Sequence, residues 1–200
     1  MPMPSHSSSL FSRSTLLACV LLLSGIFFRV LRVDLAPEVL TNFSPLMAAA
    51  LCGALFLPGV IGLVIPLIAL LVSDALLNIH YGEPLISKQL LWTLPCYLIA
   101  IGIGWMLRER RGAYLPALTG TLAASLIFYM VTNTGCWLGQ VAYPQNFGGW
   151  VQALTVGLPC YPPTWHFFRN SLMGDILFTA LFVTLFHSVR NLSARSTVVA

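Results

Sequence analysis

The stretch VIGLVIPLIALLVSDALLNI, residues 60–79, contains a single charged side chain, Asp74. An α-helix needs about 20 mostly apolar residues to cross the hydrocarbon core of a bilayer. The stretch therefore predicts a transmembrane helix. Asp74, near its far end, is of interest because an ionisable residue at membrane depth is costly and usually has a partner or a function.

The whole chain has the composition of a membrane protein. Of its 200 residues, 58% are hydrophobic and 8% are charged, whereas soluble domains carry about 25% charged residues. This excludes a soluble globular domain and a disordered chain. Five further apolar stretches predict spans at 15–33, 43–57, 89–107, 115–131 and 172–189. We expect an all-α polytopic membrane protein with about six transmembrane helices, in which a single membrane domain (15–189) lies between polar tails (1–14 and 190–200).

Residues 134–169 differ from the predicted spans. They are rich in glycine and proline and contain five Trp and Tyr side chains. Because such aromatic side chains prefer the membrane–water interface, we predict an aromatic loop that caps one membrane face. Residues 150–158 could form one or two turns of interfacial helix within it. The alternative is a flexible connecting loop.

The ten basic residues predict the orientation, and the net charge of +4 needs no nucleic-acid partner because they are scattered over the predicted loops. Loops rich in Lys and Arg remain cytoplasmic, and the tightest cluster is Arg108, Arg110 and Arg111. With an uncleaved first helix, both termini are then cytoplasmic in a bacterial inner membrane, and the aromatic loop is external. The predicted cytoplasmic set is Arg13, Arg108, Arg110, Arg111, Arg190 and Arg195; the external set is Arg29, Arg32, Lys88 and Arg169.

Polar side chains concentrate at the predicted external ends of the spans. Nine of them form our candidate binding site: Arg29, Asn42, Asp74, Asn78, Asn133, Trp137, Tyr161, Asn170 and Asp175. Arg29 is the best-placed cation for either aspartate. One interpretation is an Arg–Asp clamp that fixes helix packing. The other is a pocket that binds a small polar solute, with Trp137 and Tyr161 above it. A proton-coupled site is a third possibility.

Motifs for catalysis and metal binding are missing from the sequence. It contains no HExxH, GxSxG, Walker A or glycine-rich dinucleotide motif. We therefore expect no enzyme activity, no cofactor and no metal. The five cysteines form no CxxC pair; Cys136 and Cys160 are either free thiols or a disulfide on the oxidising side. A face of small residues, Ala49, Ala50, Gly53 and Ala54, serves either internal packing or docking of another membrane subunit.

Several motifs recur in the order of a known family. These are Asn42-Phe43-Ser44-Pro45 before LMAAAL (46–51), Ser73-Asp74, Thr132-Asn133 with Trp137, Gly157-Leu158 with Tyr161, Phe167-Phe168 with Asn170, and Gly174-Asp175. The chain resembles an uncharacterised bacterial membrane family. It is similar in layout to the substrate-binding S components of energy-coupling-factor (ECF) vitamin transporters. That resemblance implies external ligand binding under a loop cap, and partnership with a transmembrane coupling subunit and ATPases.

These observations lead to two functional hypotheses. The first is a membrane subunit that binds a small polar or vitamin-like solute for uptake. Its partners would be the solute, membrane lipid and the coupling subunits. The second is a structural or assembly protein of the inner membrane without a small-molecule substrate.

Overall fold

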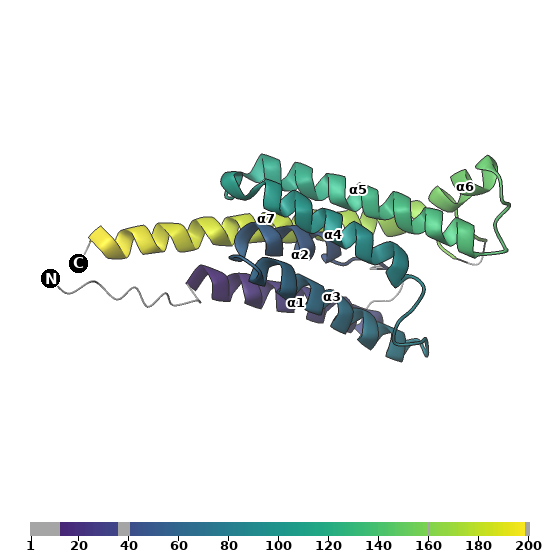
Figure 1. Ribbon diagram of the computed structural model, residues 1–200, viewed down its shortest axis with the longest axis horizontal. Helices are drawn as coiled ribbons and strands as arrows, with labels where there is room; N and C mark the ends of the chain where they lie inside the picture. The colour runs from purple at the N-terminus through teal and green to yellow at the C-terminus, as the bar shows by residue number, and fades with distance from the viewer. Residues whose placement is uncertain (1–12, 36–40, 160, 199–200) are drawn as a thin grey trace.

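A computed structural model describes residues 13–35, 41–159 and 161–198. Within these residues the chain forms seven α-helices and one 3-10 helix. The elements are α1 (Arg13–Leu35), α2 (Leu46–Phe56), α3 (Ile61–His80), α4 (Leu90–Met106), η1 (Arg108–Arg110), α5 (Tyr114–Gly139), α6 (Phe147–Leu154) and α7 (Thr164–Val198). They form an elongated bundle with α6 at one end (Figure 1). We call this the α6 end and the opposite one the η1 end. Since the described residues contain no strand, the predicted all-α class is confirmed.

Helix α2 forms the centre of the bundle. It contacts α1, α3, α4, α5 and α7, and every residue from Met47 to Leu55 is buried. Small residues make this packing possible: a Cβ on Gly53 would lie 2.3 Å from Pro66 Cγ, and one on Gly104 would lie 2.3 Å from the carbonyl oxygen of Leu51. The small-residue face of α2 is therefore used for internal packing, the first of the two alternatives.

Side chains from distant elements close both ends of α2. At its N-terminus, the backbone N–H of Ala48 donates to Asp175 Oδ1 of α7 (2.9 Å). At its C-terminus, Arg108 of η1 donates from Nε to the carbonyl of Ala54 (2.7 Å) and from Nη2 to that of Leu57 (3.0 Å). A carboxylate at the positive end of a helix and a guanidinium at the negative end both oppose its macrodipole. They also satisfy backbone groups that a buried helix end would leave unpaired.

Three helices in the described residues are long and apolar enough to cross a membrane, rather than the six that we expected. They are α3, α5 and the Thr164–Ser188 part of α7. The predicted span 43–57 is wrong, because α2 has only 11 residues, a length of about 16 Å against about 30 Å of hydrocarbon. Helix α4 has 17 residues, and α1 contributes a shorter apolar stretch, Leu22–Leu31. The apolar character of α2 reflects burial in protein, not contact with lipid.

The predicted aromatic loop is shorter than expected. Helix α5 continues to Gly139 and α7 begins at Thr164, so only 140–163 connect them. This connection contains α6, which covers part of the predicted interfacial helix. The Asn146 side chain caps α6 by accepting from Gly149 N–H (2.9 Å), and Trp150 Nε1 donates to Thr134 Oγ1 on α5 (2.9 Å). These contacts favour an ordered cap over the flexible-loop alternative.

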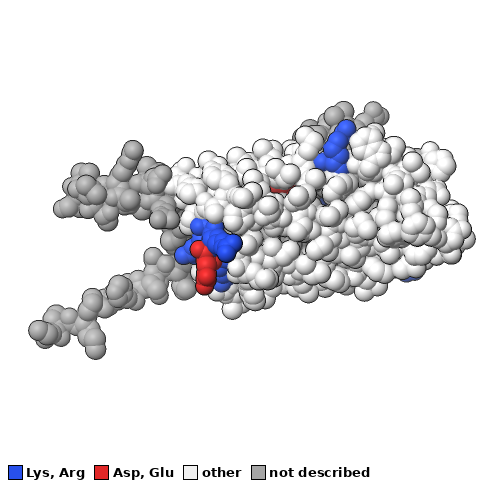
Figure 2. Space-filling model, turned by 90° about the horizontal axis from the view of Figure 1, so that it is seen from above, with Lys and Arg blue, Asp and Glu red and all other residues white. Residues whose placement is uncertain are grey.

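Charged side chains are sparse on the bundle surface. Figure 2 shows one face with a cluster of basic and acidic side chains toward the η1 end, a second basic patch toward the opposite end and a wide uncharged area between them. The η1 segment contributes Arg108, Glu109 and Arg110. A wide uncharged area between charged ends is typical of a protein that spans a membrane.

Candidate ligand-binding cavity

A cavity of about 450 Å³ opens near the α6 end of the bundle. Four long helices line it: α3 with Asp74, Leu77 and Asn78; α4 with Thr93; α5 from Phe128 to Cys136; and α7 from Thr164 to Ser171. Arg29 of α1 and residues of the connecting segments complete the wall. The volume falls within the range of small-molecule sites, about 300–1,000 Å³.

Six of the nine predicted site residues line this cavity. They are Arg29, Asn42, Asp74, Asn78, Asn133 and Tyr161. The first five come from four separate parts of the chain, so the inference that polar groups of different spans meet at one end agrees with the geometry. Trp137, Asn170 and Asp175 do not line it.

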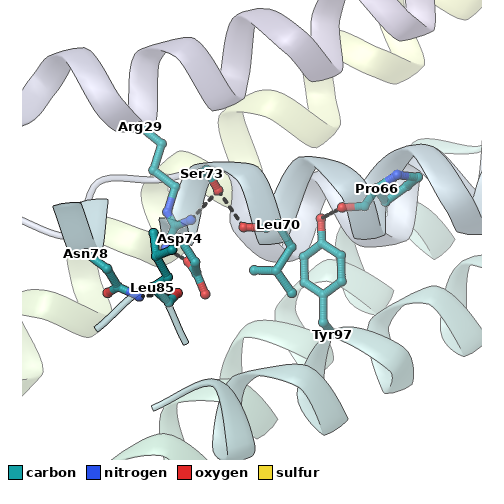
Figure 3. A network of polar contacts seen from close by, with 8 residues as sticks. All are labelled: Arg29, Pro66, Leu70, Ser73, Asp74, Asn78, Leu85 and Tyr97. Atoms are coloured by element: carbon teal, nitrogen blue, oxygen red, sulfur yellow. Dashed lines mark hydrogen bonds and ion pairs between the residues drawn. The ribbon is translucent and has the colours of Figure 1, made fainter. Parts of the chain in front are cut away.

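An ion pair joins Arg29 and Asp74 on the cavity wall. Arg29 Nη2 lies 2.6 Å from Asp74 Oδ1, and the side chains are 15% and 19% exposed. The other guanidinium nitrogen, Nη1, donates to Ser73 Oγ, whose hydroxyl in turn donates to the carbonyl of Leu70 (3.0 Å). Figure 3 shows Arg29 reaching from its own helix to these residues of α3. The sequence placed Arg29 near an aspartate, and the geometry selects Asp74 as its partner.

Two asparagines on the wall use their amide nitrogens for local structure. Asn78 Nδ2 donates to the carbonyl of Leu85 (3.0 Å), which fixes the α3–α4 connection beside the cavity (Figure 3). Asn133 Nδ2 donates to the carbonyl of Tyr129 one turn earlier (2.8 Å). Within the described part of the chain, neither amide oxygen receives a hydrogen bond. Each is therefore an acceptor available to an occupant of the cavity.

Asp175 lies deeper than the cavity and holds α2. Its Oδ1 accepts from Ala48 N–H, and its Oδ2 accepts from the Ser125 hydroxyl (2.7 Å). The side chain is 2% exposed and lines a smaller chamber of about 190 Å³, which shares Arg29, Asn42 and other wall residues with the cavity. Next to it, the hydroxyls of Thr121 and Thr179 form a hydrogen bond (2.8 Å). Asp175 therefore fixes helix packing through a helix terminus and Ser125, whereas the Arg–Asp pair of the clamp interpretation is formed by Arg29 and Asp74.

The other two residues outside the wall hold connecting segments in place. Asn170 Nδ2 donates to the carbonyl of Thr41 (2.9 Å) and fixes the turn before α2, where Asn42 adopts φ 58°. Trp137 Nε1 donates to the carbonyl of Pro144 (2.9 Å), and the Trp137 carbonyl accepts from Gln145 Nε2 (2.8 Å). Both residues therefore shape the cavity indirectly. Tyr161 remains at its edge and is 66% exposed.

Aromatic side chains form a part of the site that the sequence reasoning missed. Phe128, Tyr129, Phe167 and Phe168 all line the cavity. The rings of Tyr129 and Phe168 stack with centroids 4.5 Å apart, and the Tyr129 hydroxyl donates to the carbonyl of Leu154 in α6. The adjacent aromatic pairs at 128–129 and 167–168 were a usable signal in the sequence, because they lie near the end of the predicted span 115–131 and shortly before the predicted span 172–189.

The structure describes one of the two cysteines that we considered for a disulfide. Cys136 lines the cavity and is a free thiol, which agrees with the first of the two alternatives and not with a Cys136–Cys160 disulfide. Cys160 and residues 1–12 lie outside the described residues. Among the residues that the structure describes, no three His, Cys, Asp or Glu side chains gather in a way that could hold a metal ion.

The fold and the composition define the class of this chain: an all-helical protein with the long apolar helices of an integral membrane protein. Within that class, the chain belongs to a family described as "Family of unknown function (DUF6580)", whose model matches residues 9–197. No curated protein and no solved structure matches it. The predicted membership of an uncharacterised family is thus confirmed, and none of these comparisons supports the likeness to ECF S components.

Proposed function

We propose that this protein is a substrate-binding membrane subunit for uptake of a small polar or vitamin-like solute. The observation that carries the proposal is the 450 Å³ cavity, whose wall joins four long helices and combines neutral polar groups with aromatic rings. Ligand sites are usually concave, largely apolar and equipped with a few well-placed polar groups. A scaffold protein has no need for such a space.

The proposal includes a place in the membrane and a set of partners. With the basic η1 end on the cytoplasmic side of a bacterial inner membrane, the cavity would open to the outside and receive the solute there. The chain has no Walker A motif, so ATP-driven uptake would need a transmembrane coupling subunit and ATPases, as in the S-component layout. In that layout the shorter apolar stretches of α1 and α4 would cross by local thinning of the bilayer, whereas α2 would remain enclosed by the other helices.

Ligand-dependent stabilisation tests the proposal. A ligand that binds only the folded state stabilises it by about 2.7 kcal/mol at 100 times its Kd. The full chain, purified in mild detergent, is heated with and without a small-molecule extract of the cells that produced it. We expect the extract to raise the midpoint of thermal unfolding, and mass spectrometry of the retained fraction to show the bound compound.

Two tryptophan variants on α5 give matched controls. Asn133→Trp places a large ring in the cavity and should abolish the stabilisation, because Asn133 lines the wall. Leu126→Trp adds the same ring to a position that is 48% exposed on the bundle surface and should keep it. If the extract stabilises neither the parent chain nor Leu126→Trp, the protein has no small-molecule ligand in that extract and the assembly-protein hypothesis replaces this one.

A further inference from the structure

The charges around the cavity cancel. Among the described residues that line it, only Arg29 and Asp74 are charged, and they form an ion pair with each other. Lys88 lies between two lining residues in sequence, but its side chain is exposed and is not part of the wall. An occupant therefore meets no net charge from the wall.

Asp175 does not change this balance. It borders the smaller chamber, but its two oxygens already accept from Ala48 N–H and the Ser125 hydroxyl. Its position at the N-terminus of α2 places it against the positive end of the helix macrodipole. A ligand cation would have to compete with these partners for a side chain that is 2% exposed.

The remaining polar groups of the wall are neutral. The side chains of Asn42, Gln89, Thr93 and Gln140 line the cavity and make no hydrogen bond within the described ranges 13–35, 41–159 and 161–198. Amides and hydroxyls both donate and accept hydrogen bonds. Thr93 is buried (5% exposed) and, like other buried polar groups, needs a partner. The amides of Asn42, Gln89 and Gln140 are exposed and offer further neutral donors and acceptors, so the wall favours an occupant that carries neutral hydrogen-bonding groups.

Aromatic rings supply the rest of the binding surface. Phe128, Tyr129, Phe167 and Phe168 present ring surface to the cavity, and the stacked arrangement of Tyr129 and Phe168 fixes two of these rings. Aromatic pairs are more favourable than their buried area alone predicts. A flat, unsaturated ring therefore fits this wall better than a saturated one.

We infer that the cavity takes an uncharged compound that combines an aromatic ring with amide-like or hydroxyl hydrogen-bonding groups. This rests on the proposed function and narrows it to a substrate class. A carboxylate or a cation would either remain without a counter-charge or break the Arg29–Asp74 pair, and an unpaired charge in such a place is strongly unfavourable. Thus the same ion pair that fixes α1 to α3 also selects against charged solutes.

Three probes of the same shape test the charge preference: benzamide (neutral), benzoate (anionic) and benzamidinium (cationic). Cyclohexanecarboxamide tests the ring. Binding to the full chain in detergent is measured by calorimetry, with thermal unfolding as a second readout. We expect benzamide to bind at least about tenfold more tightly than either charged probe, and about fivefold more tightly than cyclohexanecarboxamide. Equal or tighter binding of benzoate, benzamidinium or cyclohexanecarboxamide overturns the inference.

Variants of the ion pair should reverse the preference in opposite directions. Asp74→Asn leaves Arg29 uncompensated and should favour benzoate; Arg29→Gln leaves Asp74 uncompensated and should favour benzamidinium. Glu109→Gln removes an exposed carboxylate at the η1 end and should leave the order unchanged. If a single variant fails to fold, the double variant Arg29→Gln/Asp74→Asn keeps the wall neutral and should still prefer benzamide. An unchanged preference in both single variants refutes the role of the pair.

The same measurements distinguish a wrong ligand class from a wrong proposed function. If the cell extract stabilises the protein but benzamide does not bind, the ligand class is wrong while the uptake proposal stands. If neither binds, both fail. Benzamide binding that survives in Asn133→Trp lies outside the cavity and also overturns the inference.

Discussion

Asp175 is the residue whose replacement discriminates most sharply between a structural and a ligand-binding role. Replacing it with alanine removes the acceptors of two buried donors, Ala48 N–H and the Ser125 hydroxyl. These residues are 0% and 2% exposed, so water does not replace the carboxylate. Each orphaned group costs about 1–3 kcal/mol, and the lost charge–dipole interaction at the α2 N-terminus about 0.3–2 kcal/mol.

The expected loss for Asp175→Ala is therefore about 2–8 kcal/mol, a large part of the about 5–15 kcal/mol that stabilises a typical domain. Asp175→Asn keeps an acceptor for Ala48 N–H, and the Ser125 hydroxyl can rotate to accept from the new amide. For this variant we expect a smaller loss of about 1–2 kcal/mol. Ser188→Ala, which removes an exposed hydroxyl bonded to its own helix, is the control on α7 and should change stability by less than about 0.5 kcal/mol.

The assay is thermal and denaturant unfolding in a fixed detergent, together with binding of the ligand from the extract. We expect the order Ser188→Ala, Asp175→Asn, Asp175→Ala in decreasing stability, with ligand affinity in Asp175→Asn close to that of the parent. An Asp175→Ala protein as stable as the parent but unable to bind the ligand would refute the clamp and make Asp175 a ligand-contacting residue.

Three further predictions concern the centre and the cap of the bundle. Arg108→Met removes two charge-assisted hydrogen bonds to the end of α2 and should destabilise the protein by at least about 2 kcal/mol. The control Arg111→Met changes an exposed position and should leave the midpoint of thermal unfolding unchanged. Gly104→Ala places a Cβ 2.3 Å from the Leu51 carbonyl oxygen and should lower the free energy of unfolding by about 1–3 kcal/mol. Its control is Gly102→Ala on the same helix, which has open space around it and should be neutral or stabilising by up to about 1 kcal/mol. Equal melting points for the two variants would contradict the packing of α4 on α2. Trp150→Phe loses the hydrogen bond to Thr134 and should raise hydrogen exchange of residues 140–163 without a change in the rest of the chain; unchanged exchange would mean that the indole nitrogen does not hold α6.

The sequence predicted α3 well, but it missed the C-terminal part of α5 and both ends of α7 by eight or nine residues, and it took α2 for a transmembrane span. Helix α3 was predicted to within one residue at each end, because twenty apolar residues in a row have few other structures open to them. The stretch 43–57 has the same apolar character, but an apolar side chain satisfies a protein core as well as it satisfies lipid. Its length was the one available sign, since its 15 residues fall short of the about 17–25 that a transmembrane helix needs.

The end of α5 could not be predicted because its residues resemble those of a loop. Thr132, Asn133 and Thr134 instead bond their side chains to carbonyls one turn earlier (2.7, 2.8 and 2.7 Å), so they continue the helix while satisfying their own polar groups. The site was predicted in outline for a related reason. Span order brings polar residues to the same end, but which aspartate meets Arg29 depends on the depth at which α1 and α3 pack.

The two closures of α2 have a consequence for biosynthesis. Arg108 follows α2 by about fifty residues, but Asp175 lies 127 residues after Ala48 along the chain. A nascent chain that has emerged only as far as α5 already contains α2 and the guanidinium for its far end, but nothing for its N-terminal N–H groups. The N-terminus of α2 can therefore be completed only after α7 has been synthesised, and a chain that stops before residue 164 leaves Ala48 N–H without this acceptor.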